Sequence, residues 1–151
     1  MLAERLKPGG EVTIATDQDV DLKLDVLSDK VDEMPNVILK GDCDRKDVLS
    51  DVETQVWQET HRDVSVVIKL MEVYEHLNDG HRLVGLMVRE GELAQYFGVS
   101  ILFRKEDELL IKLAAIGQPR PTWGVKQAVK KVADLILKNH SGLQLVSTTV
   151  G

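Results

Sequence analysis

Residues 82–117 read RLVGLMVREGELAQYFGVSILFRKEDELLIKLAAIG, and this stretch decides the fold class of the chain. Its apolar residues fall into three runs, at 83–88, 93–103 and 109–116, with short polar segments between them. Polar segments of four or five residues between apolar runs are typical of hairpin loops, which join neighbouring antiparallel strands. The stretch therefore predicts an antiparallel meander over residues 82–117.

A helix is predicted to follow the meander at about 122–139. The prolines of Gln118-Pro-Arg-Pro121 stop the sheet because proline cannot donate a backbone hydrogen bond, and Thr122 can cap the helix that begins there. Four apolar residues at helical spacing form one face of this helix: Val125, Val129, Val132 and Ile136. Gly142 ends the helix, and residues 143–150 are expected to form a strand or an ordered tail.

Residues 64–77 carry two competing patterns. Alternate apolar residues from Val64 to Leu70 indicate a strand, whereas Val67, Met71 and Tyr74 repeat at helical spacing. Four β-branched residues at the start of the segment favour a strand. We therefore expect this segment to continue the meander, with a helix as the alternative.

A second helix is predicted at about 45–60, because Asp44 can cap it and its apolar residues share one stripe, namely Val48, Leu49, Val52, Val56 and Trp57. Nearer the N-terminus, residues 20–26 alternate strictly between apolar and charged side chains, which predicts a strand paired with Val12 and Ile14. Residues 36–40 predict another short strand.

The expected fold class is α+β. We expect one domain over residues 1–151, in which an antiparallel sheet of five to seven strands, including the meander 82–117, carries the helices at about 45–60 and 122–139 on one face. A sheet that is covered on one side offers its other face to water or to a second subunit, so the sequence suggests a homodimer.

Composition excludes several classes of function. The formal net charge of -6 disfavours sequence-independent binding to nucleic acid or to anionic lipid, and six aromatic residues are too few for a base-stacking platform. The first residues contain Glu4 and Arg5 where a signal peptide needs an apolar run, and no stretch is apolar enough to span a bilayer. With Cys43 as the only thiol, these features predict a cytoplasmic protein.

No group of residues makes a recognised metal, nucleotide or catalytic motif. Asp17, Asp19 and Asp21 have the spacing of the first ligands of a calcium loop, but Leu22 stands where that loop needs glycine. Asp42, Asp44 and Asp47 are explained in part by helix capping, and the histidines lack the His-Glu-x-x-His spacing of zinc sites. We expect no metal, no cofactor and no catalytic residue.

The function that we expect is a non-catalytic binding or adaptor protein, such as a chaperone-like accessory, immunity or regulatory protein, that acts through protein–protein contacts. Its expected interface contains a tryptophan at the helix start, nearby basic residues and apolar sheet residues: Trp123, Arg120, Lys126, Lys130, Tyr96, Val99, Ile101 and Phe103. The alternative is a small enzyme or ligand-binding domain whose site is assembled from Cys43, His61, His76, His81 and nearby Asp residues.

Overall fold

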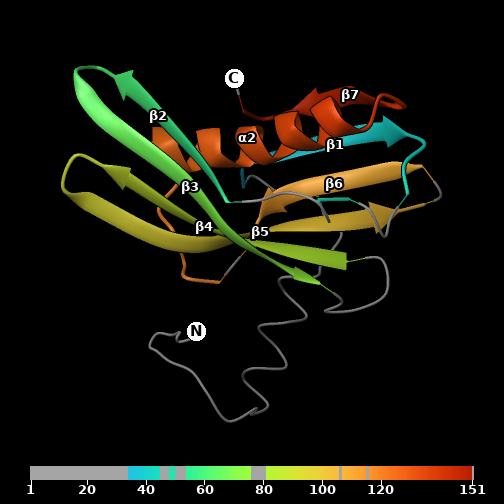
Figure 1. Ribbon diagram of the computed structural model, residues 1–151, viewed down its shortest axis with the longest axis horizontal. Coiled ribbons are helices and arrows are strands. Elements are labelled where there is room, and N and C mark those ends of the chain that lie inside the picture. Colours follow the sequence, from blue (N-terminus) through green and yellow to red (C-terminus); the bar gives the residue numbers. More distant parts are fainter. Residues whose placement is uncertain are drawn as a thin grey trace, which may run out of the picture.

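A curved antiparallel sheet with one helix packed against it forms the described part of the molecule (Figure 1). The computed structural model describes residues 34–44, 48–49, 54–75, 81–105, 107–114 and 116–150. Within these ranges lie the strands β1 (Asn36–Gly41), β2 (Gln55–His61), β3 (Val64–Glu75), β4 (His81–Glu90), β5 (Leu93–Arg104), β6 (Glu108–Leu113) and β7 (Leu143–Thr148), and the helix α2 (Trp123–Asn139).

The predicted meander is confirmed. The seven strands lie in the order β2-β3-β4-β5-β6-β1-β7, and every described pair is antiparallel. Residues 81–113 supply three neighbouring strands, while β1 joins β6 to β7, the strand that follows the helix. The sheet curls around α2 as a half-barrel, so β2 and β7 are its two edges (Figure 1).

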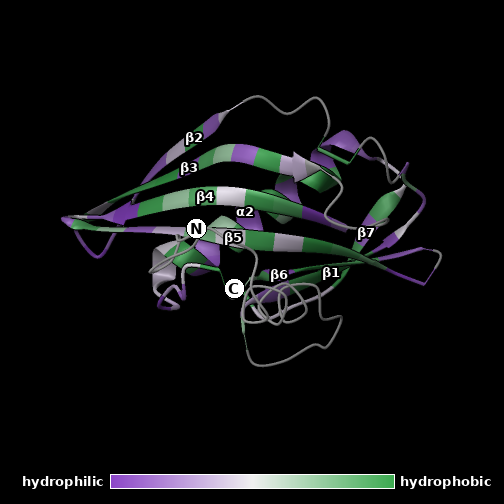
Figure 2. Cartoon of the chain, turned by 90° about the horizontal axis from the view of Figure 1, so that it is seen from below, coloured by the Kyte–Doolittle hydropathy of each residue, from purple (hydrophilic) through white to green (hydrophobic). Residues whose placement is uncertain are grey.

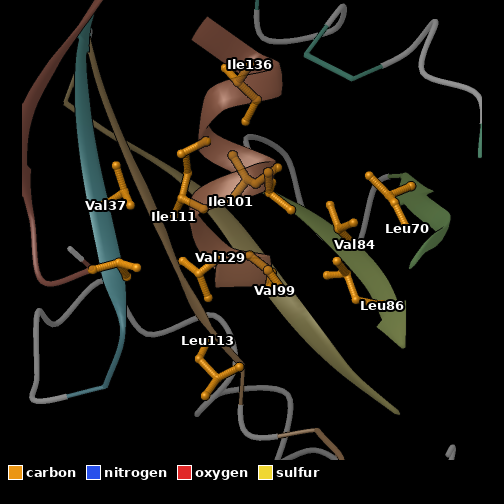
Figure 3. Close-up of a cluster of buried hydrophobic side chains, with 14 of the residues drawn as sticks. Val37, Leu70, Val84, Leu86, Val99, Ile101, Ile111, Leu113, Val129 and Ile136 are labelled. Carbon is orange, nitrogen blue, oxygen red and sulfur yellow. The ribbon is translucent and has the colours of Figure 1, made fainter. Parts of the chain in front are cut away.

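The predicted helix at 122–139 is also confirmed, as α2. The Thr122 hydroxyl accepts a hydrogen bond from the backbone N–H of Val125 at 3.3 Å, which satisfies one donor of the first turn. The four residues of the predicted apolar face are fully buried in the core shown in Figure 3, together with side chains from β1 and from β3 to β6. The described part of the chain contains no helix with the length and apolarity that a bilayer crossing requires.

The predicted helix at about 45–60 is wrong over its second half, because residues 55–61 form the edge strand β2. The inward-facing residues of β2 include Glu59 and His61, which contact Lys131 and Trp123 of α2. An edge strand with polar residues on its inner face lacks the alternation of apolar residues that identifies a strand. The helical spacing of the apolar residues from Val48 to Trp57 was therefore the stronger pattern. Only one helix occurs among the described residues.

Segment 64–77 is a strand, as the β-branched residues predicted, and it ends at Glu75. The pairing of β3 with β4 shifts register between Leu70 and Glu72. Residue Met71 is therefore an extra residue in the strand, which explains why no single period fits the whole segment. The predicted strand at 36–40 is confirmed as β1. Of the segment 143–150, expected to be a strand or an ordered tail, Leu143–Thr148 form the strand β7. The strands expected at 12–14 and 20–26 lie outside the described residues.

Both faces of the sheet are buried over β5 and β6. The inner face packs against α2, yet the outward-facing Ser100, Leu102 and Leu110 are also at most 1% exposed. Hydrophobic residues follow one another along these strands, which gives β5 the long green stretch in Figure 2. The outer face is therefore not left open to water over these two strands, contrary to the one-sided burial expected from the sequence.

Two glycines face each other across the outer surface of β4 and β5. Gly85 pairs directly with Gly98. A Cβ atom on Gly85 would lie 3.4 Å from Cε2 of Tyr74, and one on Gly98 would lie 3.0 Å from Cδ1 of Leu83. Side chains of neighbouring strand positions thus pack close to the backbone of the two glycines.

Candidate functional site

The start of α2 is fixed to the inner face of the sheet by contacts with three strands. The backbone N–H of Arg120 donates to Oε1 of Gln95 on β5 at 2.8 Å. The hydroxyl of Thr122 donates to the Glu90 carboxylate on β4. Thr122 also caps the helix, so one residue both begins α2 and holds it on the sheet.

The third contact joins α2 to the edge strand β2. The rings of His61 and Trp123 stack with their centroids 4.2 Å apart and their planes 5° from parallel. Farther along the contact between α2 and β2, Nζ of Lys131 lies 2.7 Å from Oε2 of Glu59 in an ion pair. All four side chains are half-buried. Long polar and aromatic side chains, rather than small apolar ones, therefore close the gap between β2 and α2.

The hairpin tips of β2–β3 and β4–β5 project beyond the first turn of α2 (Figure 1). Val64 and Leu93 continue the inward-facing rows that contain the buried Val66 and Phe97, but they are 42% and 45% exposed. They are exposed because the helix begins too late to cover them. We call Val64 and Leu93 the ledge; His61 is the partner of Val64 in the β-ladder.

Three basic residues lie in the loop before α2 and in its first two turns. Arg120 and Lys126 are exposed, Lys130 is half-buried, and the first turn of the helix contains no acidic residue. We call Arg120, Lys126 and Lys130 the basic rim. A helix N-terminus carries a partial positive charge, so basic residues there add to the local potential and do not stabilise the helix. These three basic residues belong to a chain whose formal net charge is -6.

The predicted interface residues do not form one surface. Trp123 stacks on His61, the partner of Val64, and the backbone of Arg120 bonds to Gln95, two residues from Leu93. Lys126 and Lys130 lie in the first two turns of α2. Tyr96 is 63% exposed, but it belongs to the outer face of β5. On the inner face of the same strand, Val99 and Ile101 are fully buried and Phe103 is half-buried against the core, so the first two are closed to a partner in this conformation.

The residues of the alternative, enzymatic site are not brought together either. His61 ends β2 at the end of the sheet where Glu90 ends β4, with β3 between them, whereas His81 begins β4 at the opposite end. The nine steps along β4 from His81 to Glu90 correspond to roughly 30 Å at the rise of an antiparallel strand. Cys43 and Asp44 follow β1, with Cys43 packed against the core. His76 lies outside the described residues.

Metal-ligating side chains do not cluster in the part of the chain that the structure covers, where no three His, Cys, Asp or Glu residues meet in a suitable arrangement. Asp17, Asp19, Asp21 and Asp47 fall outside that part, and Asp42 and Asp44 lie within it.

The residues predicted from the sequence include Trp123 and the basic rim but not the ledge. Val64 and Leu93 were assigned to apolar strand runs, and nothing local distinguishes them from buried neighbours. The available signal is their position directly beside the hairpin turns, at 62–63 and 91–92. Comparisons of this chain with models of known protein families, with curated proteins and with solved structures find no match.

Proposed function

We propose that this protein is a non-catalytic binding or adaptor protein that recruits a protein partner through the ledge and the basic rim. The observation that carries the proposal is the exposure of Val64 and Leu93 at positions whose equivalents farther along the same strands form the core. Exposed apolar residues beside a polar rim are the usual composition of a protein–protein contact.

The chemistry of this surface indicates what the partner presents. An apolar side chain of the partner would cover Val64 and Leu93, and Trp123 beside them would supply an aromatic contact of the kind enriched in interface hot spots. Carboxylates of the partner would face the basic rim, where complementary charge speeds association and excludes basic partners. The single cysteine of the chain supports placing this activity in a reducing, cytoplasmic compartment.

Site-specific photo-crosslinking in the native host tests the proposal. A benzophenone amino acid replaces Leu93 on the inner face of β5 or, as the matched control, Tyr96 on the outer face of the same strand. We expect a cross-linked protein from position 93 and none from position 96, identified by mass spectrometry. A product between two copies of this chain would identify the partner as a second copy.

Variants of the ledge then establish whether the contact matters. We expect V64S/L93S to lose the cross-linked partner on co-purification, K126E/K130E to weaken its binding, and Y96S to retain it. All three change surface residues, so their thermal unfolding should stay close to that of the unmodified protein. Equal cross-linking from both positions, or full retention of the partner by folded V64S/L93S, would refute the proposed surface.

A further inference from the structure

The edge strand β2 is held by two kinds of contact. In the described part of the sheet its backbone pairs only with β3, while two of its inward-facing side chains reach α2. One of these is Glu59, in the ion pair with Lys131, and the other is His61, in the stack with Trp123. Histidine is the side-chain type that can gain or lose a charge near neutral pH.

We infer that the His61–Trp123 stack is a pH-dependent latch, in which protonation of His61 tightens the hold of α2 on β2. The nearly parallel rings place the imidazole over the face of the indole, and that face carries the negative part of the ring quadrupole. An imidazolium at this position gains a cation–π attraction that the neutral imidazole lacks. The inference does not depend on the proposed function, because it concerns only how β2 is held.

The charged groups around the latch do not remove the difference in attraction between the imidazolium and the neutral imidazole. Glu59 on β2 and Glu90 on β4 are carboxylates, which favour the imidazolium, but each already has a partner on α2 or at its cap. On the side of α2, the basic residues Lys126, Lys130 and Lys131 disfavour it. Arg62 and Asp63 in the exposed turn after β2 carry opposite charges. From β3 only apolar side chains, Val64 and Val66, face inward here.

Hydrogen exchange of the β2 amides tests the latch in the wild-type protein. After correction for the intrinsic effect of pH, we expect the protection of residues 55–61 to be about two- to five-fold greater at pH 5.5 than at pH 7.5, as the strength of an exposed to half-buried cation–π contact implies. H61Q should abolish this difference. H140Q, which removes a histidine at the far end of α2, should retain it.

Fluorescence gives an independent readout. The chain has two tryptophans, so W57F leaves Trp123 as the only indole, and a protonated imidazole in contact with an indole quenches its emission. We expect the emission of W57F to fall as pH is lowered from 8 to 5, and that of W57F/H61Q to stay level. An unchanged β2 protection across this pH range in the wild type, or the same change in H61Q, would overturn the inference.

Discussion

Replacing Gly124 by alanine tests whether the start of α2 rests on β4 as closely as the structure shows. A Cβ atom at this position would lie 2.7 Å from Cγ1 of Val88 and 2.8 Å from Oε1 of Glu90. The carboxylate is the end of a flexible side chain and can turn away, but it then loses the hydrogen bond from Thr122. Val88 is 1% exposed and β-branched, so its methyl group has no free rotamer to adopt. The first turn must therefore retreat by about 0.7 Å to restore an ordinary contact.

The two energetic effects of G124A oppose each other. Alanine favours a helix over glycine by up to about 1 kcal/mol. Overpacking a core contact costs about 1–3 kcal/mol. We expect the packing cost to dominate and the free energy of unfolding to fall by about 1–2 kcal/mol. The retreat also separates Trp123 from His61, so the tryptophan emission of the native protein should change.

Urea unfolding followed by circular dichroism at 222 nm measures the difference. With a slope of about 2 kcal/mol per molar urea, the midpoint of G124A should fall by roughly 0.5–1 M. V88A removes the obstructing methyl groups, so G124A/V88A should be more stable than the sum of the two single effects predicts. A gain of stability in G124A, as helix propensity alone would give, would refute the close seating of α2 on β4.

Three further predictions address the cap, the core and the outer face. T122A should lower the free energy of unfolding by about 1 kcal/mol or more, because it removes both the cap and the hydrogen bond to Glu90, and T122S should restore most of the loss in the same urea assay. I136A should cost about 2–5 kcal/mol and I136V about 0.5–1.5 kcal/mol, since Ile136 is fully buried. Burial raises the pKa of Tyr74 to about 12, and the hydrogen bond to Glu72 and the charge of Glu72 contribute in the same direction. Absorbance at 295 nm should therefore show this phenol ionising above its ordinary pKa of 10. E72Q should lower the pKa of Tyr74. The unfolded chain loses this proton first, so Tyr74 should reduce stability as pH rises from about 10 to 12, and Y74F should lack that contribution.

The elements that the sequence predicted correctly are those whose pattern is set by burial against the core. Strands β4 to β6 carry long apolar runs because both of their faces are buried over much of their length. The helix α2 has a cap, an apolar stripe and a glycine after its end. In each case local propensity and tertiary burial agree, and the prediction holds.

The element that sequence reasoning missed is β2, in which local propensity and tertiary burial disagree. In β2 the inner face carries Glu59 and His61, and their partners Lys131 and Trp123 lie more than sixty residues farther along the chain. The ledge has the same origin. Whether Val64 and Leu93 are covered depends on where α2 begins over the curled sheet. A single sequence does not specify the position of the helix start relative to the strand ends.

The facing glycines of β4 and β5 have a chemical consequence. The Tyr74 ring lies over Gly85, where a Cβ atom would just touch it, at 3.4 Å from Cε2. The same placement supplies part of the burial that makes the phenol a weaker acid. The backbone of one strand thus contributes to the proton affinity of a side chain on the next, so the alkaline titration of the protein depends in part on a strand position that has no ionisable group of its own.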